Sequence, residues 1–201
     1  MIRVAIVDDH HAVRLGLHSA LRSEPGLVPV GSAADAAECA PLLYRSRPDI
    51  VLLDYNLPDI DGLTLCREIK AQALAPGVIL YSAFADGSMT IPAIVAGADG
   101  LLDKGVPARE LFAAIRQVIG GGEALPPVSP EQHRAAGAAL DDADLPILGM
   151  LVDRTPTPEI ADTLRLDHAT VKRRIARMLE HLTVSVSTAP VLPRSRIGAS
   201  R

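Results

Sequence analysis

The stretch Ile50-Val51-Leu52-Leu53-Asp54 decides the fold of this 201-residue chain. Four consecutive apolar residues, preceded nearby by Pro48 and ended by an aspartate, are typical of a strand that is buried on both faces. The start of the chain repeats this order, because the β-branched run at 2–7 is followed by Asp8 and Asp9. Both segments therefore predict strands of a parallel sheet that carry carboxylates at their carboxyl ends.

Outward from these strands, short apolar runs alternate with segments of helical periodicity as far as residue 119. We expect strands at 2–7, 28–30, 50–53, 78–81 and 101–102, and helices at 13–21, 33–44, 63–72, 89–96 and 108–119. This alternation predicts an α/β fold, a five-stranded doubly wound parallel sheet of the flavodoxin-like kind. Helices would then cover both faces of the sheet.

Side chains that can bind metal and phosphate follow several of the predicted strands. Asp8 and Asp9 end the first strand, Asp54 ends the third, Ser82 ends the fourth, and Lys104 follows the fifth. In a parallel open sheet, ligands bind beyond these carboxyl ends. Clustered carboxylates suit a hard cation such as Mg²⁺, and a lysine with a hydroxyl suits phosphoryl oxygens. Each residue alone is an ordinary turn or cap residue, so their joint placement at one rim carries the prediction.

Composition and charge narrow the class of protein. Apolar residues make up 48% of the chain, and no apolar run approaches the roughly 20 residues that span a bilayer. Because the N-terminus lacks a signal-peptide pattern and there are only two cysteines, we expect a cytoplasmic chain without disulfides. Residues 154–201 carry nine basic and four acidic side chains, which predicts an anionic partner for this segment.

The alternating pattern ends at Gly120-Gly121-Gly122. We predict a linker at 120–139, a small all-α domain at 140–184 and a disordered tail at 185–201. The expected helices lie near 131–139 in the linker and at 145–151, 158–164 and 169–182 beyond it. Thr157 is the predicted N-cap of the second of these three, and Asp167 that of the third.

The last two predicted helices have the spacing of a helix-turn-helix, with a turn of about three residues between them. Basic side chains lie on or near the face opposite the apolar face of the second helix, at Lys172, Arg173, Arg174 and Arg177. In a helix-turn-helix the second helix enters the major groove, where such side chains bind phosphates and read guanine edges. The alternative interpretation is a solvated basic face on a short helical bundle.

The motifs of the N-terminal region resemble those of response-regulator receiver domains. The resemblance rests on Ile6-Val7-Asp8-Asp9-His10, on Val51-Leu52-Leu53-Asp54 with Pro58 and Asp61-Gly62, and on Gly97-Ala98-Asp99-Gly100 ahead of Lys104. It spans residues 1–119. The resemblance implies Asp54 as the phosphoacceptor, Ser82 as the switch hydroxyl and Lys104 as the partner of the phosphoryl group. The implied Mg²⁺ ligands are Asp8, Asp9, Asp54 and the backbone carbonyl of Asn56. One departure concerns activation, because Leu101 stands where receivers usually have an aromatic residue.

The C-terminal region resembles the DNA-binding domain of NarL/FixJ response regulators, also called LuxR-type. Glu159-Ile160-Ala161, Leu166 and Thr170-Val171-Lys172 carry this resemblance, which covers residues 140–184. It implies double-stranded promoter DNA as a partner. Two features depart from the family: Pro146 falls in the first helix, and the residues after Leu182 lack the period of the family's fourth helix.

These observations predict a two-domain response regulator and not an enzyme. A sensor histidine kinase would phosphorylate Asp54 with Mg²⁺, the helix-turn-helix would bind promoter DNA, and two copies would pair through the receiver. One alternative is an atypical regulator controlled by a protein partner or ligand without phosphorylation, which Leu101 and the missing helix favour. Another is a phosphohydrolase, but Asn56 stands where that class has its general acid. His10, His11 and His18 are assigned no catalytic role.

Overall fold

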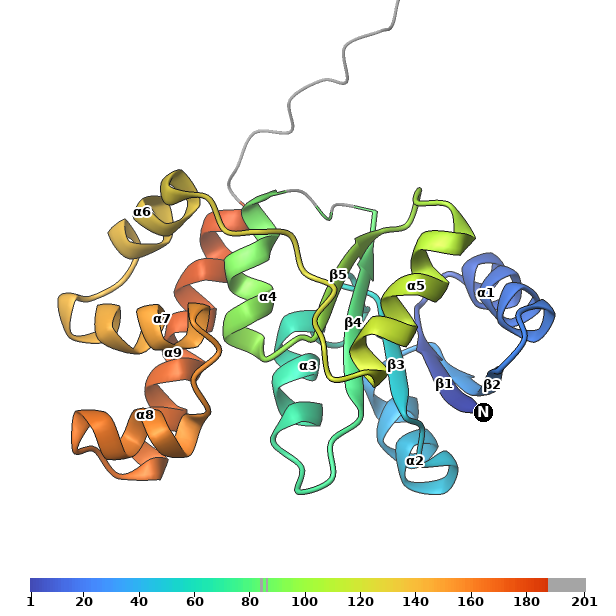
Figure 1. The fold of residues 1–201 in the computed structure, drawn as a ribbon, viewed down its shortest axis with the longest axis horizontal. Helices are drawn as coiled ribbons and strands as arrows, with labels where there is room; N and C mark the ends of the chain where they lie inside the picture. The colour runs from blue at the N-terminus through green and yellow to red at the C-terminus, as the bar shows by residue number, and fades with distance from the viewer. Residues whose placement is uncertain (84, 86, 188–201) are drawn as a thin grey trace, which may run out of the picture.

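A five-stranded parallel sheet forms the centre of the N-terminal region (Figure 1). The computed structural model describes residues 1–83, 85 and 87–187. The strands lie in the order β2-β1-β3-β4-β5. Their bounds are Ile2–Val7 for β1, Leu27–Ala33 for β2, Ile50–Leu53 for β3, Gly77–Ser82 for β4 and Gly100–Asp103 for β5. The prediction of a doubly wound parallel sheet is therefore confirmed.

Five helices cover the two faces of this sheet. They are α1 (His11–Ser23), α2 (Ala36–Ser46), α3 (Gly62–Lys70), α4 (Thr90–Ala96) and α5 (Ala108–Ile119), and the 3₁₀ turn η1 (Gly87–Met89) precedes α4. Successive strand residues point to opposite faces. Val4 and Ile6 accordingly pack with α1 and α5, whereas Ala5 and Val7 pack with α2 and α3.

The register of the central strands aligns their carboxyl ends. Val7 pairs with Leu53, and Leu53 pairs with Leu80. Asp8 and Asp54, the residues that directly follow Val7 and Leu53, therefore leave the sheet at the same edge. At the same edge, Ser82 of β4 pairs with Asp103 of β5, and Lys104 comes next in the chain.

Helices are the regular elements of the C-terminal region among its described residues, and Ala124, which precedes them, forms an isolated parallel bridge with Gly100 of β5. The elements of this region are α6 (Pro130–Ala138), the 3₁₀ turn η2 (Asp142–Asp144), α7 (Leu145–Val152), α8 (Thr157–Leu164) and α9 (His168–Ser187). Ser129 opens α6 with a capping box, because its hydroxyl accepts from Gln132 N and the Gln132 side chain accepts from Ser129 N. The predicted linker thus contains the expected helix.

Helix α4 lies between the sheet and the C-terminal helices (Figure 1). All seven of its residues are buried, and it contacts α3 on one side and α6, α7 and α9 on the other. A single apolar cluster consequently extends from Val7 and Leu53 of the sheet to Ile175, Met178 and Leu182 of α9. The two regions share one core across α4.

Some details of the sequence prediction are wrong. Ala33 ends β2, although the sequence predicts it as the start of a helix at 33–44. The N-cap of α8 is Pro156, and Thr157 is its first helical residue, since Pro156 has the extended backbone of a cap. Helix α9 continues to Ser187, beyond the predicted end at 182 and into the segment expected to be a tail. The cap at Asp167 is confirmed, because its Oδ1 accepts from Thr170 N at 2.9 Å. Residues 188–201 lie outside the described part of the chain.

Candidate phosphoryl-acceptor site and helix-turn-helix

Asp54 sits at the end of β3 and is only 2% exposed. Its Oδ2 lies 2.8 Å from Lys104 Nζ, and its Oδ1 has no hydrogen-bond partner among the described residues. Gly62, the first residue of α3, allows the chain to pass close to Asp54, because a Cβ there would lie 2.2 Å from the Asp54 carbonyl oxygen. Asp54 is therefore a buried carboxylate with an oxygen that has no hydrogen-bond partner. Burying a charged oxygen in this way costs free energy of folding.

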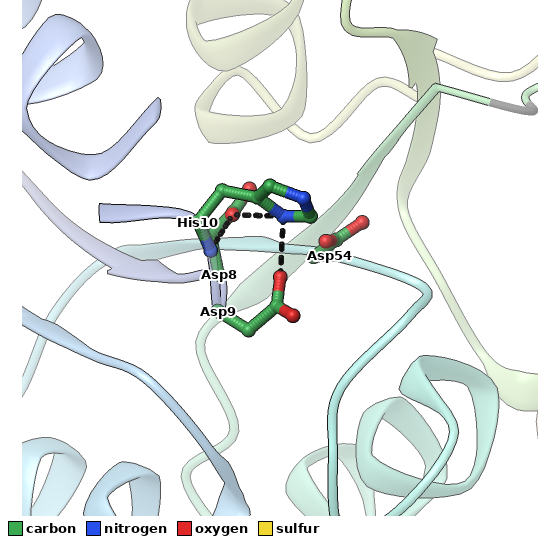
Figure 2. A group of neighbouring side chains, drawn as sticks. All are labelled: Asp8, Asp9, His10 and Asp54. Carbon is green, nitrogen blue, oxygen red and sulfur yellow. Dashed lines mark hydrogen bonds and ion pairs between the residues drawn. The ribbon is translucent and has the colours of Figure 1, made fainter. Parts of the chain in front are cut away.

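Three acidic side chains and one imidazole gather at this rim. Asp8, Asp9, His10 and Asp54 each offer a ligand atom, and these four atoms lie within 4.8 Å of one another. Figure 2 shows the four side chains, with the His10 ring contacting both Asp8 and Asp9. The predicted convergence of Asp8, Asp9 and Asp54 is therefore present in the fold.

Lys104 bridges two of the carboxylates. Its Nζ lies 2.6 Å from Asp8 Oδ2 and 2.8 Å from Asp54 Oδ2, and its side chain is 15% exposed. Burial alone would lower the pKa of Lys104, but its contacts with Asp54 and Asp8 outweigh this effect and raise it. The lysine therefore remains a cation.

Burial raises the pKa of Asp54 above the usual aspartate range, and Lys104 offsets this only in part. Asp8 adds to the shift because a second negative charge disfavours ionisation. The carboxylate of Asp54 is thus less stable here than in water. A further positive charge at the rim would stabilise the ionised form of Asp54.

The charges and donors of the rim suit a divalent cation. Three carboxylates and one ammonium leave two formal negative charges, the number that Mg²⁺ neutralises. The donors are carboxylate oxygens, which hard cations prefer, and the unpartnered Oδ1 of Asp54 is a ready ligand atom. The residues present therefore fit Mg²⁺.

The remaining predicted residues lie as follows. Ser82 is fully buried at the end of β4, and its carbonyl accepts from Lys104 N at 2.9 Å. Asn56 follows Asp54 by two residues and forms an isolated bridge with Asp61. Leu101, which replaces the usual aromatic, is 3% exposed and packs in the apolar core.

Comparison with known proteins agrees with this geometry. A family model described as the response regulator receiver domain matches residues 4–116. The chain belongs to the response regulators. It is 30% identical to the DNA-binding transcriptional activator DevR/DosR of Mycobacterium tuberculosis, over 100% of this chain and 97% of that protein. It is 31% identical to the transcriptional regulatory protein LiaR of Bacillus subtilis, over 94% of each chain.

A solved structure agrees as well. The crystal structure of a LuxR-family two-component response regulator from Aurantimonas sp. SI85-9A1 has a TM-score of 0.58 and 32% identity. The match covers 66% of this response regulator and 92% of that chain. Among the described residues, no helix is both long and apolar enough to cross a membrane.

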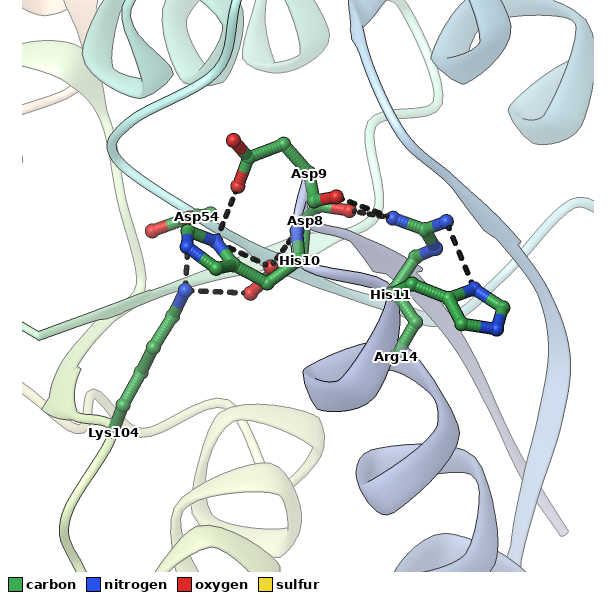
Figure 3. A network of polar contacts seen from close by, with 7 residues as sticks. All are labelled: Asp8, Asp9, His10, His11, Arg14, Asp54 and Lys104. Carbon is green, nitrogen blue, oxygen red and sulfur yellow. Dashed lines mark hydrogen bonds and ion pairs between the residues drawn. The ribbon is translucent and has the colours of Figure 1, made fainter.

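Arg14 is a residue of this response regulator's site that the sequence analysis missed. Its Nη1 donates to the carbonyl oxygens of Asp8 at 2.6 Å and Asp9 at 2.9 Å. Figure 3 shows the guanidinium reaching back from α1 to the loop that carries both carboxylates. The signal was weak, because one arginine five residues after Asp9 looks like any exposed position of a helix.

His10 is the second missed residue. The sequence predicts no catalytic role for it, and in the structure its Nδ1 lies 2.5 Å from Asp9 Oδ1 and 3.6 Å from Asp8 Oδ1. Its backbone N–H also donates to Asp8 Oδ1 at 2.8 Å. Its position directly after the two aspartates was the only available signal.

The basic residues of α9 divide into two pairs. Lys172 and Arg173 are exposed. Arg174 Nε lies 2.6 Å from Asp144 Oδ1, and Arg177 Nη2 lies 2.8 Å from Asp144 Oδ2. Asp144 is 2% exposed, so the second pair holds the start of α7 against α9. Lys172 and Arg173 are left as the cations of this helix that face solvent without an acidic partner among the described residues.

Proposed function

We propose that Asp54 accepts a phosphoryl group from a sensor histidine kinase and that this controls DNA binding by the α8–α9 helix-turn-helix. The observation that carries the proposal is the buried Asp54 carboxylate, which has an unpartnered oxygen beside Asp8, Asp9 and Lys104. A buried carboxylate with an unpartnered oxygen does not stabilise the fold by itself. It becomes favourable when a cation and a phosphoryl group join it.

In the transfer step, an Asp54 oxygen attacks phosphorus and forms a P–O bond. The P–N bond to the kinase histidine breaks, and its electron pair returns to the imidazole nitrogen. Asp8, Asp9, Asp54 and the Asn56 carbonyl would hold Mg²⁺, which would neutralise negative charge at the reacting phosphoryl group. Lys104, already 2.8 Å from Asp54 Oδ2, pairs with a phosphoryl oxygen and stabilises the charge that develops there.

In the phosphorylated state the Ser82 hydroxyl donates a hydrogen bond to a phosphoryl oxygen. The new hydrogen bond acts on the end of β4 that leads to α4, since Ser82 is the last residue of β4. Leu101 has no hydroxyl, so it cannot form a hydrogen bond in response to phosphorylation. Signal transmission therefore depends on α4, which is the element shared with the C-terminal helices.

The output is binding to double-stranded promoter DNA through α9. Lys172 and Arg173 are exposed on this helix and would contact phosphates or base edges. Arg174 and Arg177 join them only if they leave Asp144. Lys172 also lines a cavity of about 260 Å³ together with Arg67 and Lys70 of α3. DNA that contacts Lys172 would therefore lie close to α3.

The domain division that fits this function is a receiver at 1–119, a linker at 120–139 and a DNA-binding domain at 140–184, whose last helix α9 extends to Ser187. The protein would act in the cytoplasm with a kinase, promoter DNA and a second copy that pairs through the receiver. The complete set of rim residues favours phosphorylation over the atypical, phosphorylation-independent alternative.

The deciding experiment for the receiver is intact-mass measurement after incubation with acetyl phosphate and Mg²⁺. We expect one added phosphoryl group in the wild type and none in Asp54→Asn or after chelation of the metal. A wild type of unchanged mass would contradict the proposal. A phosphorylated Asp54→Asn would contradict the assignment of the residue.

The deciding experiment for the output is a DNA-shift assay on selected genomic fragments at several salt concentrations. We expect Lys172→Ala/Arg173→Ala to weaken binding and to flatten the salt slope by up to about one unit for each DNA phosphate that the variant no longer neutralises. Arg22→Ala/Arg109→Ala is the matched control, since it removes two exposed charges from α1 and α5. Equal effects of the two double variants would exclude a specific role for α9.

A further inference from the structure

The cavity of about 260 Å³ beside Lys172 has basic side chains on two of its walls. Arg67 and Lys70 of α3 line it from the receiver, and His168 and Lys172 of α9 line it from the C-terminal helices. Among the described residues, no aspartate or glutamate lines this cavity. Lys70 pairs with Asp99, the residue before β5, so the cavity lies at the amino edge of the sheet, opposite the acidic rim.

Two of these cations are not neutralised within the fold. Lys70 Nζ lies 2.9 Å from Asp99 Oδ2, whereas neither Arg67 nor Lys172 forms an ion pair with another described residue. Arg67 is partly buried, and its Nε is buried without a hydrogen-bond partner among the described residues. A cation that is partly buried without an anion costs free energy. An anion in the cavity would supply the missing negative charge.

Helix α8 begins at the same cavity. Its first residue, Thr157, and the next, Pro158, both line the cavity. Pro156 is the N-cap of α8 and has no side-chain oxygen to accept from the first N–H groups. The start of a helix carries the positive end of its dipole and attracts anions. The helix start therefore adds to the attraction that the basic side chains exert.

The size and lining of the cavity indicate the class of anion. A volume of about 260 Å³ is just below the range of drug-sized ligand sites, so the occupant is a small molecule and not a DNA duplex. Arginine binds phosphate through paired N–H groups, and lysine binds it as a point charge. Ile94, Leu151 and Ile175 complete the lining with apolar surface, which suits a less polar part of the same ligand.

We propose that this cavity binds a small phosphate-bearing anion, which contacts Arg67 on α3 and Lys172 on α9 and thereby links the receiver to the C-terminal helices. A ligand that contacts both walls binds more tightly when the walls are together than when they are apart. Its binding therefore stabilises the packing of α9 beside α3. The site is separate from Asp54 and goes beyond the proposed phosphoryl transfer.

The test is calorimetric titration of the full-length protein with inorganic diphosphate, in buffer without divalent cations. We expect one site, with an affinity at least about tenfold lower in Arg67→Gln and in Lys172→Gln, because each variant loses a charge-assisted hydrogen bond. Arg173→Gln is the matched control for anion binding, since Arg173 is the exposed neighbour of Lys172 and does not line the cavity. A parallel titration with adenosine 5′-diphosphate distinguishes the two sources of the phosphate, because tighter binding of this probe indicates a nucleotide and weaker binding a free anion.

Two results would overturn the inference. One is the absence of binding by either probe, or an equal loss of affinity in all three variants, which would indicate only a general attraction to basic surface. The other is a loss confined to one of the two cavity variants when both are folded, because the anion would then not join α3 to α9. Lys172 is exposed, so Lys172→Gln tests the site even if Arg67→Gln fails to fold. Phosphorylation of Asp54 is measured separately by intact mass, and neither result changes its assignment.

Discussion

Asp54 and Asp144 are both buried beside cations, but their pKa values are shifted in opposite directions. Asp54 and Asp144 are each 2% exposed. Asp144 has both oxygens paired, with Arg174 and Arg177, and these contacts hold its pKa below the usual aspartate value even though burial opposes them. Asp54 shares one lysine with Asp8, keeps an unpartnered oxygen, and has a raised pKa.

The difference teaches how to distinguish a structural carboxylate from a functional one. At Asp144 two guanidinium groups pair with both carboxylate oxygens, and Arg177 also lies 3.2 Å from Asp141 Oδ2, so two cations face two carboxylates and the charge is balanced within the fold. At Asp54 the rim has three carboxylates and one ammonium group. Balancing these charges requires a cation from outside the chain. The two side chains are equally little exposed to solvent, but the charges beside them differ.

The largest expected effect concerns Asp144. Asp144→Asn leaves Arg174 partly buried without its anion, and we expect the free energy of unfolding to fall by about 3 kcal/mol. Urea unfolding followed by circular dichroism measures this. Asp142→Asn is the control, since Asp142 is an exposed neighbour in η2. Equal stability of Asp144→Asn and the wild type would show that the ion pair has no structural role.

The stabilising effect of Asp144 also depends on pH in a defined direction. Its folded-state pKa is lowered relative to the unfolded chain, so the stabilisation is complete above the unfolded value and is lost as the pH falls through the folded value. Acid titration of stability should therefore show a loss in the wild type, below the ordinary pKa of an aspartate, that is absent in Asp144→Asn. A loss at neutral pH would contradict the assignment.

A smaller effect is expected at Arg14. Arg14→Gln removes the two hydrogen bonds that fix the carbonyl groups of Asp8 and Asp9, so the affinity for Mg²⁺ should fall roughly tenfold, or about 1.4 kcal/mol. Calorimetric titration with Mg²⁺ measures the dissociation constant. Arg22→Gln on the same helix should bind Mg²⁺ like the wild type. Unchanged affinity in Arg14→Gln would remove this residue from the site.

Substitution of Asp54 by Asn should change the free energy of unfolding in the direction opposite to Asp144→Asn. Asp54→Asn removes a buried, incompletely paired charge, and we expect the metal-free protein to gain about 1 kcal/mol of stability. Urea unfolding with a chelator present measures this. A loss of stability as large as that of Asp144→Asn would mean that both carboxylates stabilise the fold. It would contradict the distinction between a structural Asp144 and a functional Asp54.

The smallest expected effect lies at the contact between the two regions. Arg154, in the turn between α7 and α8, lies 2.8 Å from Glu123 Oε2 through its Nε. The pair is partly exposed, so Arg154→Gln should weaken the contact by about 0.5 kcal/mol and raise the DNA affinity of unphosphorylated protein roughly twofold. A shift assay without phosphodonor measures this. Lower affinity would indicate that Arg154 supports DNA binding instead.

The sequence by itself determined the sheet and the order of the rim residues. Apolar runs such as Ile50–Leu53 are local signals, and parallel strands place their carboxyl ends at one edge whatever the details of packing. Asp8, Asp54 and Lys104 could therefore be brought together before the fold was known. The cap at Asp167 was equally predictable, because it depends on only three residues of chain.

Only the tertiary structure decided the partners of the basic residues and the role of α4. Arg174 meets Asp144 across 30 residues, and Arg14 reaches carbonyl groups that no side-chain pattern marks. Helix α4 becomes buried on all sides because α7 and α9 pack on it, and its own sequence shows only that it is apolar. Such contacts join segments far apart in the chain, so local periodicity carries no information about them.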